Sequence, residues 1–301
     1  MALNETTWNA SAAEDESSQV LQCVPLWGMV CLVTNSTAFF INVFHLFVIS
    51  RLESLKGSKY RCVLISISLT DMTWLLVVML SSSCSGFFLS IYRSKEPSKR
   101  LPVLITIYIA TYNSYYVFLI AIVEKYMAIC KPLCYDSSII VRKLPAAFVL
   151  AWTLVAVLAT TRALLETFIP TGSFASSGLW KVCFVLLLTV LPSTVAGVLV
   201  TKIYVELRRM RVISPKVNET ADAAMYLIII FSLEMIALII NLVSLGIFLF
   251  SGIGIYIIMW ISFVKPTYTV SNVVIYGWRT KTYKQYVCGM LPCESSRASA
   301  A

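Results

Sequence analysis

The chain has 301 residues, of which 58% are hydrophobic and only 13% are charged. Because a soluble domain has about 45–50% apolar and about 25% charged residues, a soluble fold of this size could not bury so much apolar surface. The formal net charge of +9 does not indicate a nucleic-acid-binding protein, since the basic residues are scattered between apolar segments.

The N-terminal segment, residues 1–23, is polar, and all of its charged residues are acidic, unlike those of a secretory signal peptide. N-glycosylation sequons begin at Asn4 and Asn9, and they can be used only if this segment lies outside the cell. We therefore expect an extracellular glycosylated tail at 1–23 and a first helix that serves as its own insertion signal.

Long apolar segments fill residues 24–278. About 20 apolar residues are needed to cross the hydrocarbon core of a membrane, and this criterion predicts spans at 24–49, 62–87, 101–129, 144–165, 179–205, 225–250 and 253–278. The last two form one tract, which the glycine-containing segment 251–254 divides. The predicted fold is an all-α membrane protein, a seven-transmembrane helix bundle.

Lysine and arginine are frequent in the segments after the first, third, fifth and seventh predicted spans. The positive-inside rule places these segments in the cytoplasm, which puts the N-terminus outside and the tail 279–301 inside. In that tail we expect a short amphipathic helix. Cys288 and Cys293 then become candidate palmitoylation sites that would hold the helix against membrane lipids, with free cytoplasmic thiols as the alternative.

Catalytic motifs are not visible. There is no phosphate-binding loop, metal-spaced His/Cys cluster or nucleophile elbow, and the single histidine, His45, lies inside the first predicted helix. We therefore expect no enzyme activity. A channel or transporter would need polar residues recurring along one face of several helices, and those found here are isolated.

Residues 124–135, at the end of the third predicted span, read Glu-Lys-Tyr-Met-Ala-Ile-Cys-Lys-Pro-Leu-Cys-Tyr. This segment resembles the Asp/Glu-Arg-Tyr motif and following loop of rhodopsin-like (class A) G-protein-coupled receptors, and its later part is similar to odorant receptors. Residues in other spans also resemble landmarks of the family: Asn42, Asp71, Trp152, Pro192, Asn272, Tyr276 and Tyr283. The resemblance implies a plasma-membrane receptor that binds an extracellular small-molecule or peptide ligand and activates a heterotrimeric G protein.

The resemblance also implies two groups of site residues. The cytoplasmic ends of helices three, five and six would contact the G protein, and the residues implied in coupling are Glu124, Lys125, Tyr126 and Tyr276. Asp71 would form a polar core, possible site of a sodium ion, with Asn42, Ser114 and Asn272. A hydrogen-bonded helix–helix contact without an ion is the alternative, because oxygen ligands alone do not establish a bound cation.

Several positions depart from the family pattern. Lys125 replaces an arginine, which keeps the charge but loses the planar five-donor group, and we expect an exposed pair with Glu124 that contributes only about 0–1 kcal/mol. Helix six lacks the Cys-Trp-x-Pro hinge. The usual disulfide is also missing, so Cys23, Cys84 and Cys183 are left to pair in another way or to stay free.

Candidate ligand-binding residues lie in the outer half of helix three and inside helices six and seven. Tyr108, Tyr112 and Tyr115 recur at helical spacing in helix three, although such a row is also typical of helix packing. Glu234 and Lys265 are intramembrane charges, which are functional candidates by default.

The departures bear on the type of ligand. Ile107 replaces the aspartate of amine receptors, so an amine ligand is not expected. Lys265 lies one residue before the position of retinal attachment in opsins, which turns it about 100° around the helix. Chemosensory receptor, photoreceptor and seven-helix channel or transporter remain the alternatives.

Overall fold

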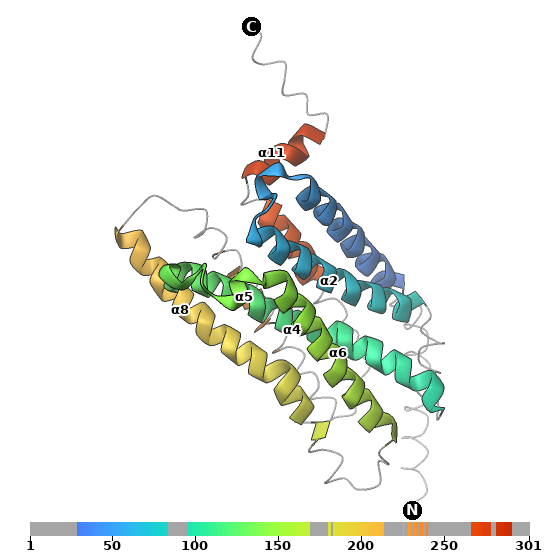
Figure 1. The fold of residues 1–301 in the computed structure, drawn as a ribbon. Helices are drawn as coiled ribbons and strands as arrows, with labels where there is room; N and C mark the ends of the chain where they lie inside the picture. The colour runs from blue at the N-terminus through green and yellow to red at the C-terminus, as the bar shows by residue number, and fades with distance from the viewer. Residues whose placement is uncertain are drawn as a thin grey trace, which may run out of the picture.

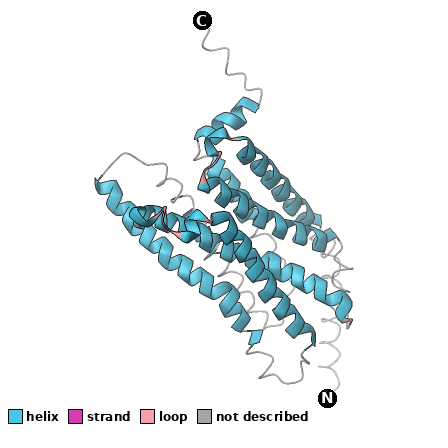
Figure 2. Cartoon of the chain, viewed as in Figure 1, coloured by secondary structure: helices cyan, strands magenta, loops and turns pink. Residues whose placement is uncertain are grey.

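The computed structural model describes residues 29–83, 96–168, 180–181, 183–213, 225, 228–229, 231–233, 235–236, 239, 266–277 and 281–290. Among these residues Figure 2 shows only helices and short loops. Helices long and apolar enough to cross a membrane cover Met29–Arg51, Lys59–Leu80, Pro97–Cys130, Leu144–Phe168 and Cys183–Met210. The chain is therefore all-α in its described part, and these five helices indicate a multi-pass membrane protein.

The sixth and seventh predicted spans are described only in part. Residues 225–239 are helical wherever the structure describes them, and residues 266–277 form a continuous helix. The five spans agree with the first five that the sequence predicts. The seven-helix bundle and its orientation in the membrane stay predictions.

The first helix, Met29–Arg51, is followed by the short 3-10 helix η1 (Glu53–Leu55) and by α2 (Lys59–Ser83). Gly57 in this connection has a φ of +77°, a left-handed conformation that residues with a Cβ atom rarely adopt. Arg61 closes the turn, because its Nη2 donates a 2.9 Å hydrogen bond to the carbonyl oxygen of Ser50. The chain thus reverses within a few residues, so the first helix and α2 meet at this end.

Helix α4 (Pro97–Cys130) packs against α2, α6 (Leu144–Phe168) and α8 (Leu191–Ile213) (Figure 1). A proline opens α4 at a position where the missing N–H is not needed. The short helices η2 (Pro132–Cys134) and α5 (Ile139–Arg142) lead from α4 to α6. Since α4 touches three long helices, its side chains determine much of what lies inside the bundle.

A π-helical segment, η3 (Leu186–Val190), runs directly into α8. Pro192 lies just after it, and a proline ring crowds the carbonyl group four residues earlier while offering no N–H. A wider π turn relieves that conflict within a continuing helix. The local sequence therefore explains why this span is not a regular α-helix throughout.

The apolar core has two main clusters. One joins the first helix, α2, α4 and α6 and includes Val48, Leu64, Val117 and Leu144. The other joins α4 to α8 and includes Ile203. Many large apolar side chains instead lie on the outside of the bundle, as expected for a surface that contacts hydrocarbon rather than water.

Helix α11 (Lys281–Met290) lies where the sequence predicts a short amphipathic helix. Its apolar side chains Tyr283, Tyr286 and Val287 pack against the first core cluster, whereas Lys284 is exposed. Figure 1 shows α11 at one end of the bundle.

Candidate functional site

The C-terminal end of α4 carries an ion pair between neighbouring residues. Lys125 Nζ lies 2.9 Å from Glu124 Oε2, and the two side chains are only 7% and 1% exposed. Our expectation of an exposed pair was wrong, because side chains from α2 and from the loop after α4 cover it. Removing one partner of a buried pair leaves an uncompensated charge, so this pair is far more sensitive to substitution than a surface one.

An aromatic residue contacts each member of the pair. Tyr135, just after η2, donates a 2.7 Å hydrogen bond from its hydroxyl to Glu124 Oε1. The Lys125 ammonium lies 4.6 Å from the ring centroid of Tyr60 on α2, a distance at which a cation and an aromatic face attract. The ion pair therefore links α4 to α2 and to the following loop.

Tyr135 is held from its other side by Lys59. The Lys59 ammonium lies 4.4 Å from the Tyr135 ring centroid and 3.2 Å from Asp136 Oδ1. Burial, and then the hydrogen bond to Glu124, raise the pKa of Tyr135 above its ordinary value. Tyr135 therefore keeps its proton near neutral pH and remains a hydrogen-bond donor to Glu124.

Aromatic contacts continue from Tyr60 to the helix 266–277. The ring centroids of Tyr60 and Tyr276 are 6.2 Å apart, and Tyr276 lies 5.2 Å from His45 and 5.3 Å from Tyr283. His45 Nδ1 and the Tyr283 hydroxyl are 3.1 Å apart. Burial, and then the neighbouring Tyr276, raise the pKa of Tyr283 to about 12. This aromatic group joins the first helix, α2, helix 266–277 and α11.

The predicted polar core is brought together only in part. Asn272 Nδ2 donates a 3.3 Å hydrogen bond to Asp71 Oδ2, and both side chains are buried. Asn42 and Ser114 are buried as well, but each donates to a carbonyl oxygen of its own helix. A sodium ion at Asp71 therefore stays a prediction.

A second charged cluster lies near the N-terminal half of α4. The Arg162 guanidinium of α6 lies 4.3 Å from the ring centroid of Tyr108 and donates a hydrogen bond to the Tyr112 hydroxyl. Glu166, one turn further along α6, accepts a hydrogen bond from Tyr108 and lies 3.4 Å from Arg100 Nη2. Tyr108 and Tyr112 thus contact charged groups across the α4–α6 interface.

The remaining predicted site residues divide into two groups. Tyr115 packs, partly buried, in an apolar cluster with α6, Tyr126 packs in the cluster between α4 and α8, and Cys288 is exposed on α11. Other predictions lie outside the described residues: Asn4, Asn9, Cys23, Cys84, Glu234, Lys265 and Cys293.

Sequence reasoning missed the contribution of α6. It named Glu234 and Lys265 as intramembrane charges but passed over Arg162 and Glu166, although a charged residue inside an apolar span is itself a signal of function. Their spacing of four residues places both on one face of the helix. The role of Tyr60 could not be read from the sequence, because nothing in its neighbourhood marks it as a partner of Lys125.

Comparison with protein-family models finds no match, and no curated protein matches the chain. A function for this chain therefore has to be inferred from the geometry of the two clusters and from the motif at residues 124–135.

Proposed function

We propose that this chain is a rhodopsin-like receptor that binds an extracellular ligand and activates a heterotrimeric G protein. The observation that carries the proposal is the buried ion pair of Glu124 and Lys125 at the end of the central helix α4. Burying two charges is costly, so the pair is stable only while Tyr60 and Tyr135 enclose it. A second conformation of this region, in which the pair is broken, can therefore lie close in free energy.

The proposed switch has two states. At rest, Lys125 is held by Glu124 and by the Tyr60 ring, while Tyr135 holds Glu124. In the active state, Lys125 leaves this enclosure and contacts the G protein. A ligand can shift the balance only by binding the two states with different affinity, and the cluster of Tyr108, Tyr112 and Arg162 at the other half of α4 is our candidate for that contact.

The direct test is nucleotide exchange on purified G-protein heterotrimers by the protein in lipid nanodiscs. Glu124→Gln removes the charge that holds Lys125 but retains an oxygen acceptor for Tyr135, so it should raise ligand-independent exchange several-fold above the parent. Glu53→Gln is the matched control, because it is the same substitution at a carboxylate whose side chain is 84% exposed and pairs with Lys56 rather than with the residues of the switch. We expect this control to behave like the parent.

Two results would contradict the proposal. One is that neither the parent nor Glu124→Gln accelerates exchange on any class of heterotrimer. The other is that both proteins conduct ions in reconstituted liposomes without affecting exchange, which would favour the channel or transporter alternative.

A further inference from the structure

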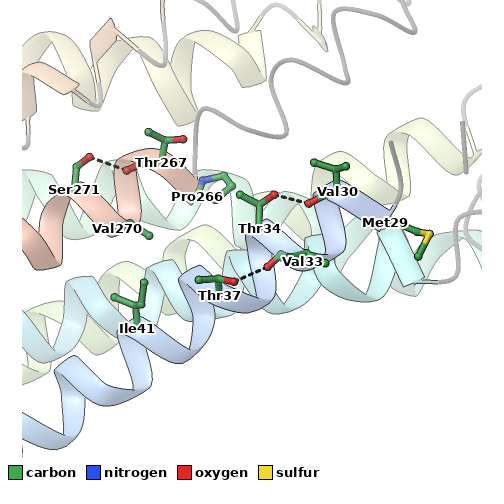
Figure 3. Close-up of a pocket in the computed structure, with 10 residues that line it drawn as sticks. All are labelled: Met29, Val30, Val33, Thr34, Thr37, Ile41, Pro266, Thr267, Val270 and Ser271. Atoms are coloured by element: carbon green, nitrogen blue, oxygen red, sulfur yellow. Dashed lines mark hydrogen bonds between the residues drawn. The ribbon is translucent and has the colours of Figure 1, made fainter. Parts of the chain in front are cut away.

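A groove of about 620 Å³ runs between the first helix and the helix 266–277 (Figure 3). The first helix contributes one continuous face to it, formed by Met29, Val30, Val33, Thr34, Thr37 and Ile41. The segment 266–271 forms the other wall. The volume lies within the range of about 300–1,000 Å³ that small-molecule sites occupy.

Three of the four described lining residues with a hydroxyl group donate to carbonyl oxygens of their own helices, and the fourth, Thr267, is not without a partner. Thr34 donates to the carbonyl oxygen of Val30, Thr37 donates at 2.8 Å to that of Val33, and Ser271 donates at 2.8 Å to that of Thr267 (Figure 3). None of the described residues that line the groove is charged. A polar ligand would lose its hydration here without finding equivalent partners, so the groove favours an apolar occupant.

The groove also has the length of one membrane leaflet. Its wall from Met29 to Ile41 rises about 18 Å at 1.5 Å per residue, and half of a hydrocarbon core is about 15 Å. Its rim includes Met29 and Val33, which are 66% and 65% exposed. Because the first helix is long and apolar enough to cross a membrane, this opening faces hydrocarbon rather than water.

We propose that the groove binds an acyl chain of a phospholipid from the leaflet at the Met29 end, which the predicted orientation makes the outer leaflet. The phospholipid headgroup then stays in the interface beyond Met29 and needs no partner inside the groove. Phospholipid is the bulk component of the surrounding bilayer, so mass action favours it over scarcer apolar molecules. This binding does not depend on G-protein coupling and can be tested without it.

The test uses phosphatidylcholine with a photoactivatable group on one acyl chain, added in equimolar amount to the purified full chain in detergent. Crosslinked peptides are mapped by mass spectrometry. We expect labelling to concentrate in residues 29–41 and 266–271, and to exceed labelling of the exposed apolar face of α6. In the Val33→Trp variant, the indole ring should displace about two methylene groups of the acyl chain from the groove. The weaker binding should lower labelling of the groove about tenfold.

Val157→Trp is the matched control. Val157 is 57% exposed on α6 and lies outside the groove, so the same change of size there should leave groove labelling unaltered. If Val33→Trp does not fold, as judged by its melting temperature, Val30→Trp on the same wall takes its place. The proposal is overturned if label spreads evenly over the exposed apolar faces, or if the tryptophan in the groove has no effect. It is also overturned if a sterol or a free fatty acid, and not unlabelled phosphatidylcholine, displaces the label.

Discussion

The two ends of α4 carry clusters of the same kinds of side chain in different surroundings. At the C-terminal end, Lys125 and Glu124 are 7% and 1% exposed, and their aromatic contacts come from α2 and a loop. At the N-terminal end, Arg100 and Glu166 are 27% and 13% exposed, and they bridge α4 and α6. The pair of Lys125 and Glu124 therefore lies inside the bundle, whereas the pair of Arg100 and Glu166 is partly exposed at its edge.

Under the proposed function, we infer separate tasks for the two ends. A buried pair loses much stability when one partner is removed, which suits a switch that must rest in one well-defined state. A partly exposed pair contributes little by itself, and its groups remain within reach of a molecule arriving from solvent. The substitutions below test whether this contrast holds.

The largest effect is expected from Lys125→Ala. Glu124 would keep its bond to Tyr135 but lose its counter-charge in a buried site, so we expect the free energy of unfolding to fall by about 3 kcal/mol. A lower melting temperature in detergent would register this loss. Lys131→Ala, an exposed lysine just beyond the helix, should change stability by less than about 0.5 kcal/mol. Equal melting of both variants would show that the pair is not the tightly held element inferred here.

The next effect concerns Arg162→Ala at the other end of α4. The arginine stacks on Tyr108 and donates to Tyr112, so its loss should destabilise the α4–α6 interface by about 2 kcal/mol. Arg100→Ala removes the partly exposed ion pair with Glu166 and should cost less than about 1 kcal/mol. The melting temperatures of both variants test this prediction. If Arg100→Ala lowers the melting temperature more than Arg162→Ala does, the prediction is wrong.

A smaller effect, with a pH signature, is expected from Tyr135→Phe. Loss of the hydrogen bond to Glu124 should cost about 1.5 kcal/mol at neutral pH, because bonds to charged groups are the stronger ones. The raised pKa of Tyr135 means that folding favours the neutral phenol. Its contribution is therefore complete below the ordinary tyrosine pKa of about 10 and is lost as pH rises above it.

Melting temperatures of the parent and Tyr135→Phe, compared across alkaline pH, check this prediction. The gap between the two proteins should narrow as pH rises above 10. A gap that stays constant would mean that Tyr135 does not act through its proton.

The smallest effect is expected from Tyr283→Phe. The substitution keeps the ring contact with Tyr276 but removes the hydroxyl that lies 3.1 Å from His45 Nδ1, at a cost of about 1 kcal/mol. Amide hydrogen exchange should become faster in α11 while the C-terminal half of α4 is unchanged. Lys284→Ala, an exposed neighbour, serves as the control and should leave exchange in α11 as it is in the parent.

The sequence predicted the elements better than their contacts. The five described spans could be found from apolar length alone, and Asp71 and Asn272 were expected together and are hydrogen bonded. Asn42 and Ser114 were expected to join them, but side-chain bonds within one helix compete with bonds between helices. The sequence analysis named neither Arg162, a charge inside the span predicted at 144–165, nor Glu166, one residue beyond it, because a charge near the end of a span can equally extend to the interface with water.

By itself the sequence determined that this chain is helical and apolar enough to need a membrane, because the length and composition of each segment are local properties. It also determined which residue types stand at the ends of α4. Only the tertiary structure decided that Lys125 lies over Tyr60, that Tyr135 holds Glu124, and that the first helix and helix 266–277 leave a groove between them. Such contacts depend on the rotation and spacing of helices distant in sequence, and a hydrophobic pattern limits those quantities without fixing them.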